Sequence, residues 1–443
     1  MLTEARCQEI FEKIRRACPA DEVEVSFNAS QSALTRFANN IIHQNVAEEG
    51  LHISVRALLD GRTARASTNK TDDDALRRVA EQAAASARWQ PQNPDLLPMP
   101  GKQTYQPVER FCEQTAAFAP EARAEAVKKV VARAEKNKLT AAGIYSTGVQ
   151  TETLLNSRGL IATHRQTKAE FSVTYLNGGS GWAKGNFTSV QQLPVEELAE
   201  SSCRKALDNH DPKELPPGRY TVILEPAAVL DLVGFLFYDF SATAVLDQRS
   251  CFTNQIGKQV FGENISISDD AYHPLQAGSA WDGEGIPRRQ VQLVEKGVLK
   301  NLVYARHTAR KMKAEPTGHG FLLPNEWGEA PMNLVFAGGS SSLEEMIRTT
   351  ERGILVTRLW YIREVDPYQK ILTGMTRDGT FSVEGGQVRR AIRNLRFNQS
   401  IKEMLKQVEL LGPAVRATGE ESFEMVVPPM RIANFRFTEV TKY

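Results

Sequence analysis

The chain has 443 residues, of which 41% are apolar and 24% charged, the usual balance of a soluble globular protein. Its 54 basic and 53 acidic residues leave a net charge of +1, which argues against a basic face for nucleic acid. This length exceeds what one ordinary hydrophobic core accommodates, so two or three domains are expected.

The N-terminal segment, MLTEARCQEIFEKIRR, is amphipathic and charged, without the apolar run of a secretion signal. The five cysteines, at positions 7, 18, 112, 203 and 251, show no CxxC spacing. A scattered, odd-numbered set is typical of reduced thiols that pack as small apolar side chains. We therefore expect a cytoplasmic protein that does not span a membrane.

The first part of the chain predicts a helix, several antiparallel strands and a second helix. Apolar spacing indicates a helix over 3–17, and period-two alternation indicates a strand over EVEVSF at 22–27. Further strands are expected at 34–45, 51–58 and 62–67, with a hairpin turn at Asp60-Gly61. Thr71 is expected to cap the helix that begins at DDDALRR.

A proline-rich loop at 90–107 separates this unit from a second one. There a helix is expected at 121–136, strands at 139–146, 151–156, 160–166 and 170–176, and a helix at 195–207. The glycine-rich segment 177–186 lacks the GxGxxG and GxxxxGK[ST] spacings, so it is interpreted as a hairpin tip and not a phosphate loop. The segment DPKELPPG at 211–218 is the best domain boundary.

We therefore expect an N-terminal α/β region over 1–215, with sub-units of about 1–90 and 108–210, and a β-rich domain over 216–443. The second domain opens on Val222–Ser241, whose central dozen residues are apolar on nearly every face, as in a fully buried helix. Mostly short strands follow, with a tight turn at Lys296-Gly297 and a capping box at Ser342 and Glu345. The predicted fold class is α+β, with the β-rich domain built around that central buried helix.

No short motif identifies a catalytic centre. The seven histidines include no HExxH or HxH pair, and GxSxG is absent, so a histidine-based metal site would need far-apart segments. In the loop Asp282–Gly285, the carboxylates of Asp282 and Glu284 are candidates for binding a cation, a substrate amine or a nearby arginine. Asp282 and the following Arg288 are candidates for substrate binding. The alternative is a tight turn that ends in salt bridges.

Two further segments have a functional and a structural interpretation. The imidazole of His319 lies between two glycines in TGHG, either as a general base or as a packed side chain. Arg377, before Asp378, is a candidate for holding a peptide or carboxylate, or for a structural Arg–Asp pair. The run LWYIREVD at 359–366, which contains Trp360, suits either a sheet edge that accepts an extended peptide or an interior strand.

Several phrases, in order along essentially the whole chain, resemble the TldD/PmbA family, whose members are also described as modulators of DNA gyrase. They are LTRFANNIIHQN, LHISVRALLDGRTARAST, TVILEPAAV, WDGEGIPRRQVQLVEKGVLKNLVY, TGHG, ERGILVT and TGMTRDGTFSVEGGQVRRAIRNLRFNQS. The resemblance implies a cytosolic assembly that cuts peptides or unfolded proteins. It also implies a central helix that carries HExxxH in TldD-type members, with a later cysteine completing a zinc site.

In this chain, the positions that correspond to that motif hold other residues. Counted from the shared VIL strand, the first histidine of the motif corresponds to Gly234, the glutamate to Phe235 and the second histidine to about Asp239. The cysteine corresponds to about Val356. Only Asp239 has a side chain able to bind metal or transfer a proton. The chain thus resembles the PmbA (TldE) side of the family, which implies a non-catalytic or regulatory subunit without its own cofactor, and zinc in a TldD-like partner. A homodimer is the other assembly considered.

Two alternatives stay open at this stage. The first is a self-sufficient hydrolase with an unusual site built from Asp239, Asp282, Glu284 and His319. The second, suggested by the gyrase name alone, is a protein that binds nucleic acid or topoisomerase; the near-neutral charge argues against direct DNA contact.

Overall fold

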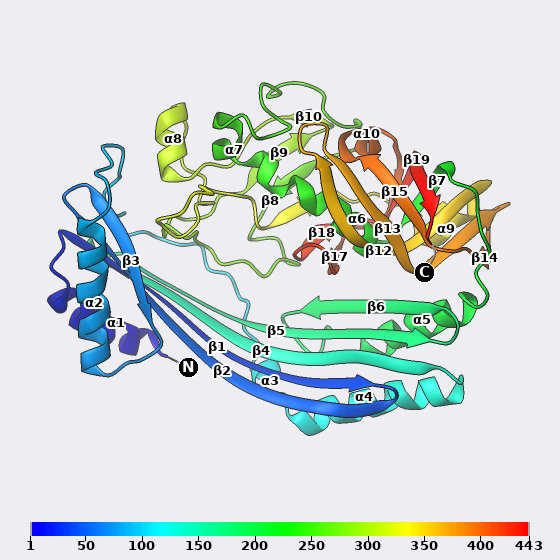
Figure 1. Cartoon of the computed structure of the whole chain (residues 1–443), viewed down its shortest axis with the longest axis horizontal. Coiled ribbons are helices and arrows are strands. Elements are labelled where there is room, and N and C mark those ends of the chain that lie inside the picture. Colours follow the sequence, from blue (N-terminus) through cyan, green and yellow to red (C-terminus); the bar gives the residue numbers. More distant parts are fainter. Residues whose placement is uncertain (1, 442–443) are drawn as a thin grey trace.

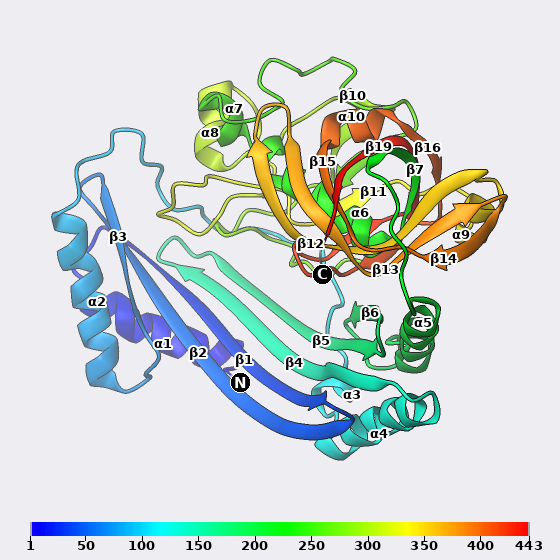
Figure 2. The same ribbon diagram turned by 45° about the vertical axis from the view of Figure 1, so that its right-hand side comes forward.

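The computed structural model describes residues 2–441 and has three β-sheets with helices packed on them, which confirms the α+β class. The first sheet is a long, bent trough, and the C-terminal half of the chain lies over its concave side (Figures 1 and 2). Within residues 2–441, no helix is long and apolar enough to cross a membrane.

The trough is a six-stranded antiparallel sheet in the order β3-β2-β1-β4-β5-β6. Its strands are β1 (Glu22–Ala38), β2 (Ile41–Leu59), β3 (Arg62–Thr68), β4 (Thr140–Asn156), β5 (Ile161–Leu176) and β6 (Ser180–Phe187). Since β1 pairs with β4 over Glu24–Phe37, strands from both expected N-terminal sub-units form this one sheet.

Helices cover the convex side of the trough only at its ends (Figure 1). At one end α1 (Glu4–Ala17) and α2 (Asp73–Arg88) pack on β1 and β2, around Ile10, Val25 and Ile53. At the other end α4 (Pro120–Lys136) and α5 (Val195–Asp208) pack around Phe171 and Tyr175; α3 (Glu113–Ala116) is a single turn.

Three sequence predictions in this region are wrong. The expected strand 34–45 contains a hairpin turn, where Asn39 and Asn40 have φ of 51° and 61°, values that asparagine tolerates better than most residues. The cap of α2 is Asp72 and not Thr71, because its carboxylate accepts the N–H of Ala75 at 2.9 Å. Most of the expected hairpin tip at 177–186 is strand β6, which pairs with β5.

The C-terminal half contains two sheets. One runs β10-β9-β8-β11-β18-β17, and the other runs β12-β7-β19-β15-β13-β14, with a further pairing of β12 to β13 that closes a ring. The strands are β7 (Gly218–Leu224), β8 (Ile267–Asp269), β9 (Val291–Glu295), β10 (Val298–Leu299), β11 (Leu334–Phe336), β12 (Arg352–Asp366), β13 (Ile371–Glu384), β14 (Gln387–Ala391), β15 (Leu395–Ser400), β16 (Val408–Leu411), β17 (Val415–Ala417), β18 (Met425–Val427) and β19 (Met430–Val440). The short helices are α7 (Ala242–Leu246), α8 (Arg306–Met312), α9 (Leu343–Arg348) and α10 (Ile401–Lys406).

The apolar stretch after β7 forms α6 (Pro226–Val233) and then a 3₁₀ helix, η1 (Gly234–Phe240), where one helix was expected. Pro226 starts α6 because a proline suits the first helical turn. Leu230, Leu232 and Val233 are completely buried in one core that also contains residues of both C-terminal sheets, such as Val356 and Leu293. The helix with no polar face therefore lies at the centre of this half.

Candidate functional site

The positions at which the resemblance places the metal ligands fall on η1, and the residues present there do not suit a metal site. At Gly234, a Cβ atom would lie 1.9 Å from Oγ of Ser422 and 2.6 Å from its Cβ. A histidine therefore has no room at this position unless the segment carrying Ser422 moves. Phe235 follows as a half-buried side chain against the core, and Val356 is buried in β12.

Asp239, at the end of η1, is fully engaged in structural contacts. Its carboxylate lies 2.5 Å from Nζ of Lys370 and accepts the N–H of Cys251 at 2.8 Å. Lys370 also contacts Glu364 at 2.7 Å. Burial raises the pKa of Asp239, and the lysine opposes that rise by stabilising the charged form. The group thus acts as one half of a buried ion pair.

The unusual ligand set of Asp239, Asp282, Glu284 and His319 is not assembled. Across residues 2–441, no group of three or more His, Cys, Asp or Glu side chains is arranged to hold a metal ion. The four residues are therefore not brought together: Asp239 is held by Lys370, whereas the other three belong to a separate cluster.

That cluster joins the DGEG and TGHG loops. Asp282 accepts the N–H of Gly320 at 2.7 Å and the N–H groups of Glu284 and Ile286, each at 2.9 Å. Glu284 accepts the N–H of Arg306 at 3.0 Å. Burial raises the pKa of both carboxyls, and the neighbouring Asp282 helps raise that of Glu284 to about 7.

His319 and Arg288 complete the cluster. His319 is 1% exposed, with Nε2 2.9 Å from Asp269 and Nδ1 2.9 Å from Oγ1 of Thr317. Arg288 donates from Nη1 to the carbonyl oxygen of Gly318 at 3.0 Å. Both ring nitrogens of the histidine thus have partners within the same half of the chain.

The cluster also contacts the trough. Tyr105, in the segment between α2 and α3, donates its hydroxyl to the carbonyl oxygen of Gly285 at 2.8 Å. Arg65 of β3 donates to the carbonyl oxygen of Leu323. Asp282 and Arg288 line a cavity of about 230 Å³ together with Asn28 of β1. The two loops therefore form one end of the contact between the trough and the C-terminal half.

A second contact between the C-terminal half and the trough lies beside Arg377 and Trp360. Arg377 stacks on Trp360, with its guanidinium carbon 4.8 Å from the ring centre. Asp378, which follows it, pairs most closely with the buried Arg358 and accepts the hydroxyl of Ser180 on β6 at 2.5 Å. Arg358 in turn lies 4.8 Å from the ring centre of Trp182 on β6. Arg377 itself keeps 44% of its side chain exposed, at 3.6 Å from Asp378.

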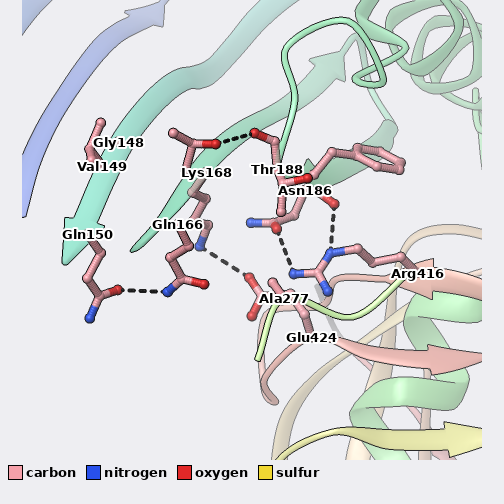
Figure 3. Close-up of a pocket in the computed structure, with 12 residues that line it drawn as sticks. Gly148, Val149, Gln150, Gln166, Lys168, Asn186, Thr188, Ala277, Arg416 and Glu424 are labelled. Atoms are coloured by element: carbon pink, nitrogen blue, oxygen red, sulfur yellow. Dashed lines mark hydrogen bonds and ion pairs between the residues drawn. The ribbon is translucent and has the colours of Figure 1, made fainter. Parts of the chain in front are cut away.

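Between these two contacts lies a polar cavity of about 260 Å³, shown in Figure 3. Gln150, Gln166 and Lys168 line it from β4 and β5, and Arg416 and Glu424 line it from the C-terminal half. Lys168 contacts Glu424 at 3.2 Å. Burial alone would raise the pKa of Glu424, but Lys168, Arg416 and a backbone hydrogen bond together hold that pKa below its ordinary value.

Arg416 ties the cavity to the edge of the trough. Its Nε donates to the carbonyl oxygen of Asn186, and its Nη2 to the side-chain oxygen, both at 3.0 Å. Amide, ammonium and carboxylate groups in one cleft can bind the N–H and C=O groups of an extended chain. The sequence analysis missed these residues because the fold brings them together from β4 to β18. Gln166 ends one expected strand and Lys168 lies between that strand and the next, so no pattern in the sequence pointed to either of them.

Comparisons with known proteins agree with this architecture. The PmbA/TldA metallopeptidase C-terminal domain matches residues 217–439, and PmbA/TldA metallopeptidase domain 1 matches residues 23–87. The metalloprotease PmbA of Escherichia coli O157:H7 is 22% identical over 435 residues, covering 93% of this chain and 92% of that protein. A metalloprotease of Methanothermobacter thermautotrophicus is 24% identical over 303 residues, only 62% of this chain and 64% of that protein.

Solved structures show the same fold. TldE from Thermococcus kodakarensis superposes with a TM-score of 0.89 at 20% identity, covering 98% of this chain and 100% of that one. A Thermotoga maritima protein, named for the modulation of a DNA gyrase, superposes with a TM-score of 0.87 at 22% identity and the same coverage. Because the C-terminal domain of the family matches half of this chain, the chain belongs to the PmbA/TldD metallopeptidase family.

Proposed function

We propose that this chain is a non-catalytic, PmbA/TldE-like subunit of a cytoplasmic peptidase, and that a TldD-like partner carries the zinc. The observation that carries the proposal is Gly234, since the position of the first zinc ligand has no room for a side chain beside Ser422. The engagement of Asp239 by Lys370 supports it, because a carboxylate held by a buried ammonium is not free to act as a ligand or a base.

In this proposal the chain contributes substrate-binding surface for peptides or unfolded proteins. The polar cavity of Figure 3 and the exposed guanidinium of Arg377 on Trp360 support this role. Asp282 and Arg288 would add to the surface through the cavity that they share with β1. In the described residues all five cysteines are free thiols, and four of them are buried, as in a reducing compartment.

The test is metal analysis and peptide cleavage on three samples: this chain alone, a TldD-like partner alone, and the co-expressed pair. We expect zinc and cleavage in the pair and no stoichiometric zinc in this chain alone. As a control, a pair whose partner has Gln in place of the HExxxH glutamate should assemble without cleaving. Stoichiometric zinc together with cleavage in this chain alone would overturn the proposal.

A further inference from the structure

The Arg288 cavity, of about 230 Å³, is the space that Asp282 and Arg288 share with strands β1 and β4 of the trough. Successive side chains of a strand point to opposite faces of the sheet. On β1, Phe27 is buried in the core that α1 and α2 form on the convex side, so its neighbours Ser26 and Asn28 face the concave side. Both of these polar residues line the cavity.

Strand β4 and the C-terminal half supply the rest of the wall. Glu152 lies opposite Asn28 in the pairing of β4 with β1, and Leu154 follows it on the same face. From the other side, Trp281 and Leu322 pack with Leu154 in a small apolar cluster. The cavity therefore combines an apolar wall with a carboxyl group on one side and a guanidinium group on the other.

Two nitrogen donors of residues that line this cavity have no hydrogen-bond partner within residues 2–441. They are Nε1 of Trp281 and Nε of Arg288, and both atoms are buried. The whole of Trp281 is only 8% exposed. Because a buried donor without an acceptor costs free energy, two of them beside one cavity indicate a bound molecule that carries acceptor atoms.

The charges at the cavity are also incompletely paired. Arg288 donates from Nη1 to the carbonyl oxygen of Gly318, but in the described part of the chain it forms no ion pair with a carboxylate. Asp282 accepts three backbone N–H groups, whereas Glu152 accepts only the side-chain amide of Gln150, at 2.8 Å. Burial raises the pKa of both carboxyls, and the charge of Arg288 opposes that rise without direct contact.

We propose that the Arg288 cavity binds a free α-amino acid with an apolar side chain. The carboxylate of this ligand accepts hydrogen bonds from Nε of Arg288 and Nε1 of Trp281, and its ammonium group donates to Glu152. Its side chain packs on Leu154 and Leu322. The inference goes beyond the proposed function, since it requires neither zinc nor cleavage by this chain.

A zwitterion suits the cavity better than a simple carboxylate or the end of a peptide. A ligand with a carboxylate alone pairs with Arg288 but brings a second negative charge close to Glu152. A volume of about 230 Å³ lies below the roughly 300–1,000 Å³ of pockets for drug-sized ligands, which favours one small molecule. In the proposed function, free amino acids are end products of peptide degradation, so the cavity would hold a product beside the substrate-binding surface.

Isothermal titration calorimetry on the purified full-length chain tests the proposal with three probes: L-leucine, N-acetyl-L-leucine and L-leucinamide. We expect L-leucine to bind with a stoichiometry of one. The acetylated and amidated forms should bind about tenfold more weakly or not at all, because each has lost one charged hydrogen-bonding group.

Two variants each remove one group and keep the shape of the side chain. Trp281→Phe removes the indole N–H, and Glu152→Gln removes the charge but keeps an oxygen for Gln150. Each should weaken the binding of L-leucine about tenfold without changing the circular dichroism spectrum. The matched controls are Trp89→Phe, at a residue that is 89% exposed, and Glu49→Gln, on an exposed part of β2; both should leave the affinity unchanged.

Three outcomes would overturn the proposal. The first is no detectable binding of L-leucine, and the second is an affinity that stays unchanged in either Trp281→Phe or Glu152→Gln. The third is equal binding of L-leucine and one of its derivatives; if that derivative is N-acetyl-L-leucine, the cavity is a site for the C-terminal carboxylate of a peptide. Because the titration uses this chain without partner or zinc, none of these outcomes decides the test of the proposed function.

Discussion

The ion pair between Asp239 and Lys370 gives the sharpest test of the structural role of Asp239. The side chains are 4% and 6% exposed, and their charged atoms lie 2.5 Å apart. Asp239→Ala leaves the ammonium of Lys370 buried, with only the partly exposed Glu364 as a partner, and leaves the N–H of Cys251 without its acceptor. Removing one partner of a buried pair costs about 3–5 kcal/mol of stability.

Urea-induced unfolding, followed by tryptophan fluorescence, measures this cost as a shift in midpoint at constant slope. The matched control is Asp247→Ala, because Asp247 pairs with Arg249 at 2.7 Å but both side chains are about half exposed. Such an exposed pair contributes about 0–1 kcal/mol.

The double variant Asp239→Ala with Lys370→Met should lose less free energy of unfolding than the sum of its two single variants, by at least about 1 kcal/mol. Each single variant leaves one charge buried without its partner, whereas the double variant removes both charges. If Asp239→Ala were no more destabilising than Asp247→Ala, or if the single effects were additive, the structural role argued for Asp239 would be refuted.

Three further predictions follow from single positions. Gly234→Ala should destabilise the chain by about 1–3 kcal/mol in thermal unfolding, with partial rescue by Ser422→Gly, whereas Gly101→Ala, whose nearest neighbour is 4.0 Å away, should be nearly neutral. Burial raises the pKa of Glu284 to about 7, so the protonated carboxyl contributes most to stability below the unfolded pKa near 4.3, and this contribution is lost as pH rises toward 7. Glu284→Gln should flatten the dependence of the unfolding free energy on pH, and an unchanged profile would contradict this prediction. Arg358→Lys should lower stability and shift the tryptophan emission, because lysine replaces neither the two-pronged contact to the buried carboxylate nor the stacking on two tryptophans; unchanged emission would count against the stack.

Local signals in the sequence predicted the elements whose geometry depends on neighbouring residues. The turn at Lys296-Gly297 has φ of 47° and 77°, as expected. Ser342 caps α9 by accepting the N–H of Glu345 at 3.1 Å, which confirms the serine half of the expected capping box. The Asn39-Asn40 turn was missed because the flanking residues continue a strand-like pattern across it.

Long-range pairing explains the remaining differences. Segments 147–150 and 167–169 have few apolar residues and separate the expected short strands. In the structure they are interior parts of β4 and β5, because each has a pairing partner on the neighbouring strand. The glycines of 177–186 likewise gave no strand signal, yet β6 forms because β5 offers a free edge. For the site, the sequence placed Asp282 and Gly320 in separate loops, and only the fold shows that the first accepts a hydrogen bond from the second.

Gly234 and Asp239, where the resemblance places two of the metal ligands, are both closely packed against other parts of the chain. A histidine at Gly234 would displace Ser422, and a histidine at Asp239 would leave the buried ammonium of Lys370 without its closest carboxylate. These obstacles involve different neighbours, so a single substitution does not remove both. Meanwhile the polar contacts that join the trough to the C-terminal half, such as Arg416 to Asn186, do not involve those positions. The cavity of Figure 3 and the η1 segment are therefore held by separate sets of contacts, so a change at Gly234 or Asp239 does not remove the bonds of Arg416.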